Sequence, residues 1–203
     1  MKTVVSLSVC MLVVFILSSL VSIGVHQPQM RINNPGKIDL TGDFVPEYVR
    51  GEGNRVAIYG QGVEVWKSPP EWRVVDWTLG DPNADGRNEL LLAFWRQDKS
   101  GVLRCHPFII GYREGIYRTL WGGSAVSDPI LDIELSDVDG DEVQELIVLE
   151  QHQASRERYI TFWRWHGWGF NLIWRSPHGY YHNLGLIPRE VKIPLGVSVS
   201  TSP

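Results

Sequence analysis

The sequence predicts an all-β protein built from antiparallel four-stranded, propeller-like units, in about 2.5–3 repeats that follow an N-terminal hydrophobic segment. Three observations predict this class. An acidic loop occurs twice, 56 residues apart, and three longer segments align around it. Beyond the N-terminal segment, no stretch shows the 3.6-residue apolar period of a helix. A four-stranded sheet that recurs every 50–60 residues is typical of a propeller blade.

The N-terminal segment, residues 1–25, is predicted to be a signal peptide or a membrane anchor. Residues 3–25 carry no charge and follow Lys2. The small-residue triplet Ser22-Ile23-Gly24 fits a cleavage site, whereas 23 apolar residues are long enough to span a bilayer as an uncleaved anchor. Both alternatives place residues 26–203 outside the cytoplasm. We therefore expect an extracytoplasmic protein that is either secreted or membrane-anchored through residues 3–25.

The remaining chain is divided by its repeat. Residues 26–54 are assigned to a linker and first strand, 55–187 to the repeat domain and 188–203 to a C-terminal tail. Within the domain, the segments 58–69, 110–121 and 163–177 each contain a strand, a glycine turn, an alternating strand and a closing tryptophan. The closing residues, Trp66, Trp121 and Trp174, are spaced by 55 and 53 residues, and we expect them to pack between repeats.

The two acidic loops place oxygen-bearing side chains at positions 1, 3, 5 and 9. We name them the 81–89 loop and the 137–145 loop. Backbone carbonyl groups at position 7 would complete each set, as they do in other calcium-binding loops. The predicted metal ligands are Asp81, Asn83, Asp85, Arg87 and Glu89 in the first loop, and Asp137, Asp139, Asp141, Val143 and Glu145 in the second.

This ligand set favours Ca²⁺, which takes six to eight oxygen ligands, over Zn²⁺, because neither loop contains Cys or His. The 137–145 loop has the higher formal charge, −4 against −3, which favours tighter binding there. Glu142 stands at position 6, where Gly86 stands in the other loop, so its backbone is expected to be less comfortable. The alternative is an acidic turn without metal, since Asp, Asn and Gly favour turns. We expect the metal, where bound, to be structural.

Around these loops the chain resembles the FG-GAP, or VCBS-type, repeat of the integrin alpha-chain propeller and of many bacterial exported proteins. The resemblance covers residues 55–187 and lies in the loop pattern and its flanks. It implies β-propeller blades with Ca²⁺ bound in the loops. The third repeat departs from the pattern, because residues 179–188 contain no acidic loop. About three repeats are visible, whereas closed propellers have four to eight blades.

Other polar and aromatic residues are interpreted structurally first. Asp76 and Asp132 each precede an acidic loop by five residues, which favours a repeat-specific hydrogen bond over a catalytic pair. Cys105 is expected to be buried. Trp163, Trp165 and Trp168 alternate around a turn and are candidates for a glycan- or peptide-binding surface.

Composition narrows the function. A net charge of −4 without a basic cluster argues against a nucleic-acid partner, and the usual nucleophile, phosphate-binding and zinc-protease motifs are absent from the sequence. The first hypothesis is therefore a calcium-stabilised binding or adhesion module, not an enzyme, that contacts a protein or glycan. The second is an assembly subunit that pairs through an open blade edge and forms an oligomer. A glycan-active enzyme is a third.

Overall fold

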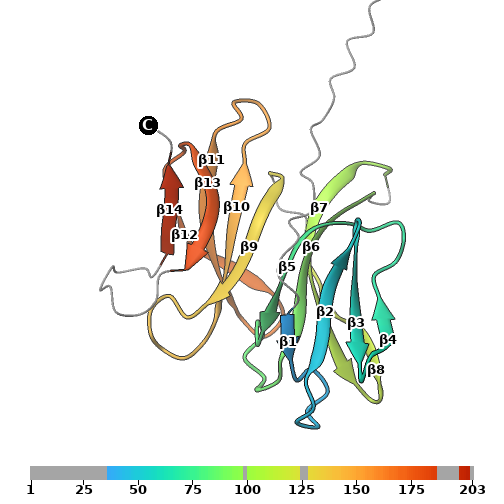
Figure 1. The fold of residues 1–203 in the computed structure, drawn as a ribbon. Helices are drawn as coiled ribbons and strands as arrows, with labels where there is room; N and C mark the ends of the chain where they lie inside the picture. Colours follow the sequence, from blue (N-terminus) through green and yellow to red (C-terminus); the bar gives the residue numbers. More distant parts are fainter. Residues whose placement is uncertain (1–35, 98–99, 124–127, 187–196, 202–203) are drawn as a thin grey trace, which may run out of the picture.

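The protein is a succession of antiparallel sheets that follow one another in chain order (Figure 1). The computed structural model describes residues 36–97, 100–123, 128–186 and 197–201, which contain fourteen strands and no helix. The all-β prediction and the four-stranded antiparallel sheets are thereby confirmed. Among the described residues no helix is long and apolar enough to cross a membrane. The predicted signal peptide or anchor over 1–25 lies outside them.

Three sheets have four strands each, and every strand pairs with its neighbour in sequence. The first sheet contains β1 (Gly36–Ile38), β2 (Glu47–Glu52), β3 (Arg55–Gly60) and β4 (Val63–Lys67). The second contains β5 (Arg73–Gly80), β6 (Glu89–Gln97), β7 (Leu103–Arg113) and β8 (Ile116–Gly122). The third contains β9 (Ile130–Ser136), β10 (Glu145–Gln151), β11 (Arg158–Trp165) and β12 (Phe170–Arg175). A further pair, β13 (Tyr181–Leu186) and β14 (Val197–Thr201), forms a two-stranded sheet.

Two of these strands extend the regular structure beyond the predicted repeat boundaries. Strands β1 and β2 lie before residue 55 and belong to the same sheet as β3 and β4. Strand β14 lies in the segment assigned as a tail and pairs with β13. The signal for β1 and β2 is weak in the sequence because both are short and Gly51 and Gly53 fall at the end of β2 and in the turn after it.

The sheets pack face to face because their central strands are apolar on both sides. In β6, Leu90, Leu92 and Phe94 face the first sheet, whereas Leu91, Ala93 and Trp95 face the third. A strand covered on both faces reads as a continuous hydrophobic run, which is what the sequence shows at this point. Period 2 therefore divides one strand between two cores.

The repeated tryptophans lie between sheets, as predicted. Trp66 packs on the core between the first and second sheets, and Trp121 on the core between the second and third. Trp174 contacts Phe162 on the next face, with ring centroids 4.7 Å apart. Trp174 is nevertheless 37% exposed, because the sheet that follows has only two described strands.

The outer face of the first sheet is polar. Glu52 accepts hydrogen bonds from Lys67, Tyr59 and Arg50, and the Arg50 guanidinium stacks on the Tyr59 ring. The Lys67 contact, followed by those from Tyr59 and Arg50, lowers the pKa of Glu52 to about 2. A polar outer face of this kind ends a stacked array, since it gives a further sheet no apolar surface to cover.

Two buried aspartates connect the first strands of successive sheets. Asp76 on β5 accepts hydrogen bonds from the N–H groups of Trp77 and of Ile133 on β9, at 2.9 and 3.0 Å. Asp132 on β9 accepts one from the N–H of Leu184 on β13, at 2.9 Å. Each aspartate therefore reaches forward to the next sheet, which confirms the predicted structural hydrogen bond.

The two carboxyl groups also contact each other. Burial, followed by a hydrogen bond with Asp132, raises the pKa of Asp76 to about 8. One proton is therefore shared between two carboxyl groups that are both withdrawn from water. The folded protein holds this proton at neutral pH, whereas an unfolded aspartate does not.

We predict that the protein loses stability as pH rises from about 4 to about 8, by at most about 1.4 kcal/mol per pH unit, because the folded state alone keeps the Asp76 proton in this window. Asp132→Asn should remove this slope. Its amide donates to Asp76 without a titratable proton and still accepts from Leu184. Urea melts across the pH window measure the effect, with Glu64→Gln on the surface as the control. A slope that is unchanged in Asp132→Asn would contradict the shared proton.

Candidate metal-binding loops

The 81–89 and 137–145 loops occupy the same place in neighbouring sheets. The first joins β5 to β6 and the second joins β9 to β10. In each, the aspartate at position 1 accepts hydrogen bonds from backbone N–H groups within the loop. Asp81 accepts from Asp85 and Gly86 at 3.0 and 2.7 Å, and Asp137 accepts from Gly140 and Glu142 at 2.5 and 3.0 Å. These bonds curl each loop around its first carboxylate.

The backbone follows the same course in both loops. Position 5 accepts from the N–H of position 7, at 3.0 Å from Arg87 to Asp85 and at 3.0 Å from Val143 to Asp141. Positions 4 and 6 have positive φ in both loops, and at position 6 the values are 82° for Gly86 and 69° for Glu142. The expected uncomfortable backbone of Glu142 is confirmed, since a residue with a β-carbon rarely adopts this conformation.

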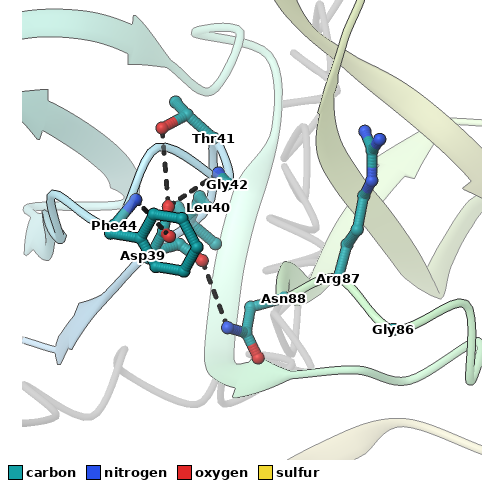
Figure 2. Close-up of a pocket in the computed structure, with 8 residues that line it drawn as sticks. All are labelled: Asp39, Leu40, Thr41, Gly42, Phe44, Gly86, Arg87 and Asn88. Atoms are coloured by element: carbon teal, nitrogen blue, oxygen red, sulfur yellow. Dashed lines mark hydrogen bonds between the residues drawn. The ribbon is translucent and has the colours of Figure 1, made fainter.

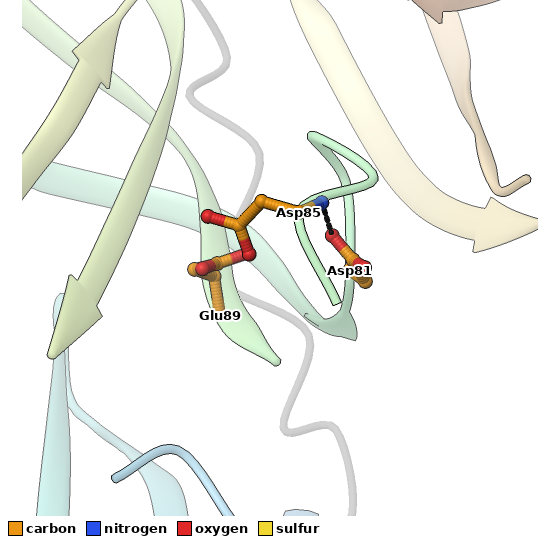
Figure 3. Close-up of side chains that lie close together, drawn as sticks. All are labelled: Asp81, Asp85 and Glu89. Atoms are coloured by element: carbon orange, nitrogen blue, oxygen red, sulfur yellow. Dashed lines mark hydrogen bonds between the residues drawn. The ribbon is translucent and has the colours of Figure 1, made fainter. Parts of the chain in front are cut away.

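Each loop gathers three carboxylates. Oxygen atoms of Asp81, Asp85 and Glu89 lie within 4.8 Å of one another, as do those of Asp137, Asp139 and Glu145. Figure 3 shows the Asp85 and Glu89 carboxyl groups side by side, with Asp81 held against the Asp85 backbone. Of the other predicted ligands, Asn83 lies 3.4 Å from Asp85 through its amide nitrogen. The carbonyl oxygens of Arg87 and Val143 stay predicted ligands.

An arginine that the sequence analysis did not select enters each cluster. Arg113, at the end of β7, donates to Asp85 and Glu89 at 2.5 and 2.7 Å. Arg164, on β11, contacts Asp139, Asp141 and Glu145 at 2.6, 3.3 and 2.5 Å. Both side chains come from the third strand of the sheet that carries the loop. The sequence gave no signal for them, because the two arginines stand at different registers relative to their loops.

The glutamate at position 9 is the most buried member of each cluster. Glu89 and Glu145 are both fully inaccessible to water. Burial raises the pKa of Glu89 to about 7, against the opposing effect of Arg113. In Glu145, Oε1 accepts hydrogen bonds from Arg164 and Oε2 accepts one from the N–H of Val138 at 3.0 Å.

A third loop with the same geometry was missed. It joins β1 to β2 and carries Asp39, Thr41, Asp43 and Glu47 at positions 1, 3, 5 and 9. Asp39 accepts from the N–H groups of Gly42 and Phe44 at 2.7 and 2.8 Å, and Asp43 accepts from Val45 at 2.8 Å. The oxygen spacing is the signal that would have found it, although Thr replaces the acidic or amide residue at position 3.

This 39–47 loop does not gather its carboxylates in the same way. Among the described residues, groups of three metal-ligating side chains within 4.8 Å occur only in the other two loops. Here Glu47 turns its Oε2 atom to the N–H of Leu40 at 2.8 Å. The 39–47 loop therefore shares the fold of the acidic loops without their carboxylate cluster.

Amide side chains at position 8 link the loops in series. Asn88 donates to the carbonyl oxygen of Asp39 at 3.1 Å, and Figure 2 shows it reaching the hydrogen-bonded turn of the 39–47 loop. Gln144 accepts from the N–H of Asp81 at 2.8 Å. In both cases position 8 of one loop bonds to position 1 of the loop before it, so each loop is held in place by its successor.

The predicted aromatic surface is only partly formed. Trp163 and Trp165 pack against the core between the second and third sheets, whereas Trp168 is 78% exposed. Tyr180 is 74% exposed. Cys105 is buried, as expected.

A scan of the chain against models of known protein families finds no match, and a search among curated proteins finds no similar sequence.

We predict that Arg164→Gln destabilises the metal-free protein by about 1–3 kcal/mol, because the fully buried Glu145 loses its counter-charge. Arg118→Gln is the matched control, since its ion pair with Glu114 is exposed on both sides and should contribute less than about 0.5 kcal/mol. Urea melts in excess EDTA measure both. Equal losses in the two variants would show that Arg164 does not neutralise the cluster.

Proposed function

We propose that this protein is a calcium-stabilised β-repeat module that binds a protein or glycan outside the cytoplasm. The observation that carries the proposal is the pair of carboxylate clusters at the same position of two neighbouring sheets. Carboxylate oxygens held on tight loops are the ligands that Ca²⁺ prefers. A cation there would join the first strand of a sheet to its second strand.

The proposal extends to the architecture. Successive four-stranded antiparallel sheets, packed face to face with a tryptophan between them, are the arrangement expected of propeller blades. We assign the repeat to the FG-GAP or VCBS type on the loop pattern. The three loops share their backbone hydrogen bonds at positions 1 and 5, which supports one repeat used three times.

Export is proposed from the N-terminal sequence. The uncharged run over 3–25 fits either a signal peptide or an anchor, and both deliver the sheets to an environment where Ca²⁺ is abundant. The partner is proposed to meet the exposed aromatic side chains near the last sheets, Trp168 and Tyr180, because aromatic faces stack on sugars and on peptide groups.

We predict that Ca²⁺ raises the melting temperature of the full chain and that EDTA lowers it again. A site occupied at tenfold its dissociation constant contributes about 1.4 kcal/mol, or about 3–6 °C for a domain of this size. Asp81→Asn combined with Asp137→Asn should abolish the response, because position 1 is lost in both clusters. Asp128→Asn, outside the loops, is the control. A melting temperature that ignores Ca²⁺ in the wild type would contradict the proposal.

An assembly subunit is the second candidate, and one observation favours it. The last sheet has two described strands where the other three have four, and Trp174 and Tyr180 beside it are exposed. Sheet edges pair with strands of other chains.

Under the second candidate, size-exclusion chromatography with light scattering gives a mass of two or more chains. Trp174→Ser should reduce that mass to one chain, because Trp174 lies on the face that a partner strand would cover. Val63→Ser, on the outer strand of the first sheet, is the control. A monomeric wild type would contradict assembly through this edge.

A further inference from the structure

The 81–89 and 137–145 loops differ at one buried carboxylate oxygen. In the 137–145 loop both oxygens of Glu145 accept hydrogen bonds, from Arg164 and from Val138. In the 81–89 loop the Oε1 atom of Glu89 accepts from Arg113, but Oε2 accepts no hydrogen bond from any residue in the described part of the chain. Glu89 has no exposed surface, so bulk water does not reach this oxygen.

The cause is the residue at position 2. In the 137–145 loop the N–H of Val138 donates to Glu145, and in the 39–47 loop the N–H of Leu40 donates to Glu47. Position 2 of the 81–89 loop is Pro82, which has no N–H group. Proline therefore removes the donor that the other two loops use, and leaves Glu89 with an unsatisfied oxygen inside the carboxylate cluster.

The arginines make the same distinction. Arg164 contacts three carboxylates of its loop, whereas Arg113 contacts two. A cation entering the 137–145 loop must replace hydrogen bonds to Glu145 that already exist. A cation entering the 81–89 loop meets an oxygen that has none, and a buried carboxylate oxygen without a partner is costly.

We infer that the 81–89 loop is the tighter of two divalent cation sites, with Oε2 of Glu89 as a direct ligand made available by Pro82. This inference rests on the proposed function and reverses the order expected from formal charge. Charge counting favours the 137–145 loop, but internal hydrogen bonds already use its carboxylates. Pro82 and Arg164 are thus the residues that set the relative affinities of the two loops.

The first test assigns the sites. The full chain, stripped of metal, is titrated with CaCl₂ at neutral pH by calorimetry. We expect two affinities about tenfold apart or more, because a hydrogen bond to a buried charge has to be displaced in only one loop. Asp81→Asn should remove the tighter site and Asp137→Asn the weaker one. Equal affinities, or loss of the tighter site in Asp137→Asn, would overturn the inference while leaving the proposed function intact.

The second test exchanges the cause. Pro82→Val restores the N–H donor and should weaken the tighter site about tenfold, whereas Val138→Pro and Arg164→Gln should each tighten the other site. Pro70→Val, at an exposed turn, is the control. Melting in EDTA confirms that each variant is folded, and Pro82→Val decides the matter should Val138→Pro not fold. An unchanged affinity in Pro82→Val would overturn the role of Glu89. A wild type that binds no Ca²⁺ in either loop would overturn both this inference and the proposed function.

Discussion

The rest of the structure depends on the buried aspartates that join the first strands of successive sheets. Asp76 and Asp132 each accept a hydrogen bond from the backbone of the next sheet, and they share a proton with each other. These bonds fix how far one sheet is displaced from the next. Each acidic loop begins five residues after its aspartate, so the same bonds also determine where the loops lie. Fold and candidate site are therefore set by one repeated contact.

Charge neutralisation is the second constraint. A tight loop that turns three carboxylates inward is unstable unless a positive group lies among them, because like charges at this distance repel strongly. Arg113 and Arg164 provide that charge from within the protein. A divalent cation would meet the same need more fully, since it contacts several oxygens at once. The loops are thus arranged so that an internal guanidinium and an external cation compete for the same carboxylates.

Much of the fold was predictable because the repeat is explicit in local chemistry. Period 2, glycine turns and the spacing of Trp66, Trp121 and Trp174 predict strands and inter-sheet packing, and the matched positions of Asp76 and Asp132 predict a structural hydrogen bond. The first sheet was harder to predict. Its strands β1 and β2 are short, and its outer face is polar because no sheet precedes it, so the apolar pattern used to recognise the other repeats is weakened there.

The sequence by itself determined the all-β class, the repeat and the oxygen-bearing residues of the 81–89 and 137–145 loops, because each depends on neighbours a few positions apart. Only the tertiary structure decided which carboxylates are satisfied. Arg113 and Arg164 reach the loops across strand pairings, and the missing donor at Pro82 matters only because Glu89 folds back onto position 2. Such contacts depend on strand register and burial, and no spacing along the chain records either.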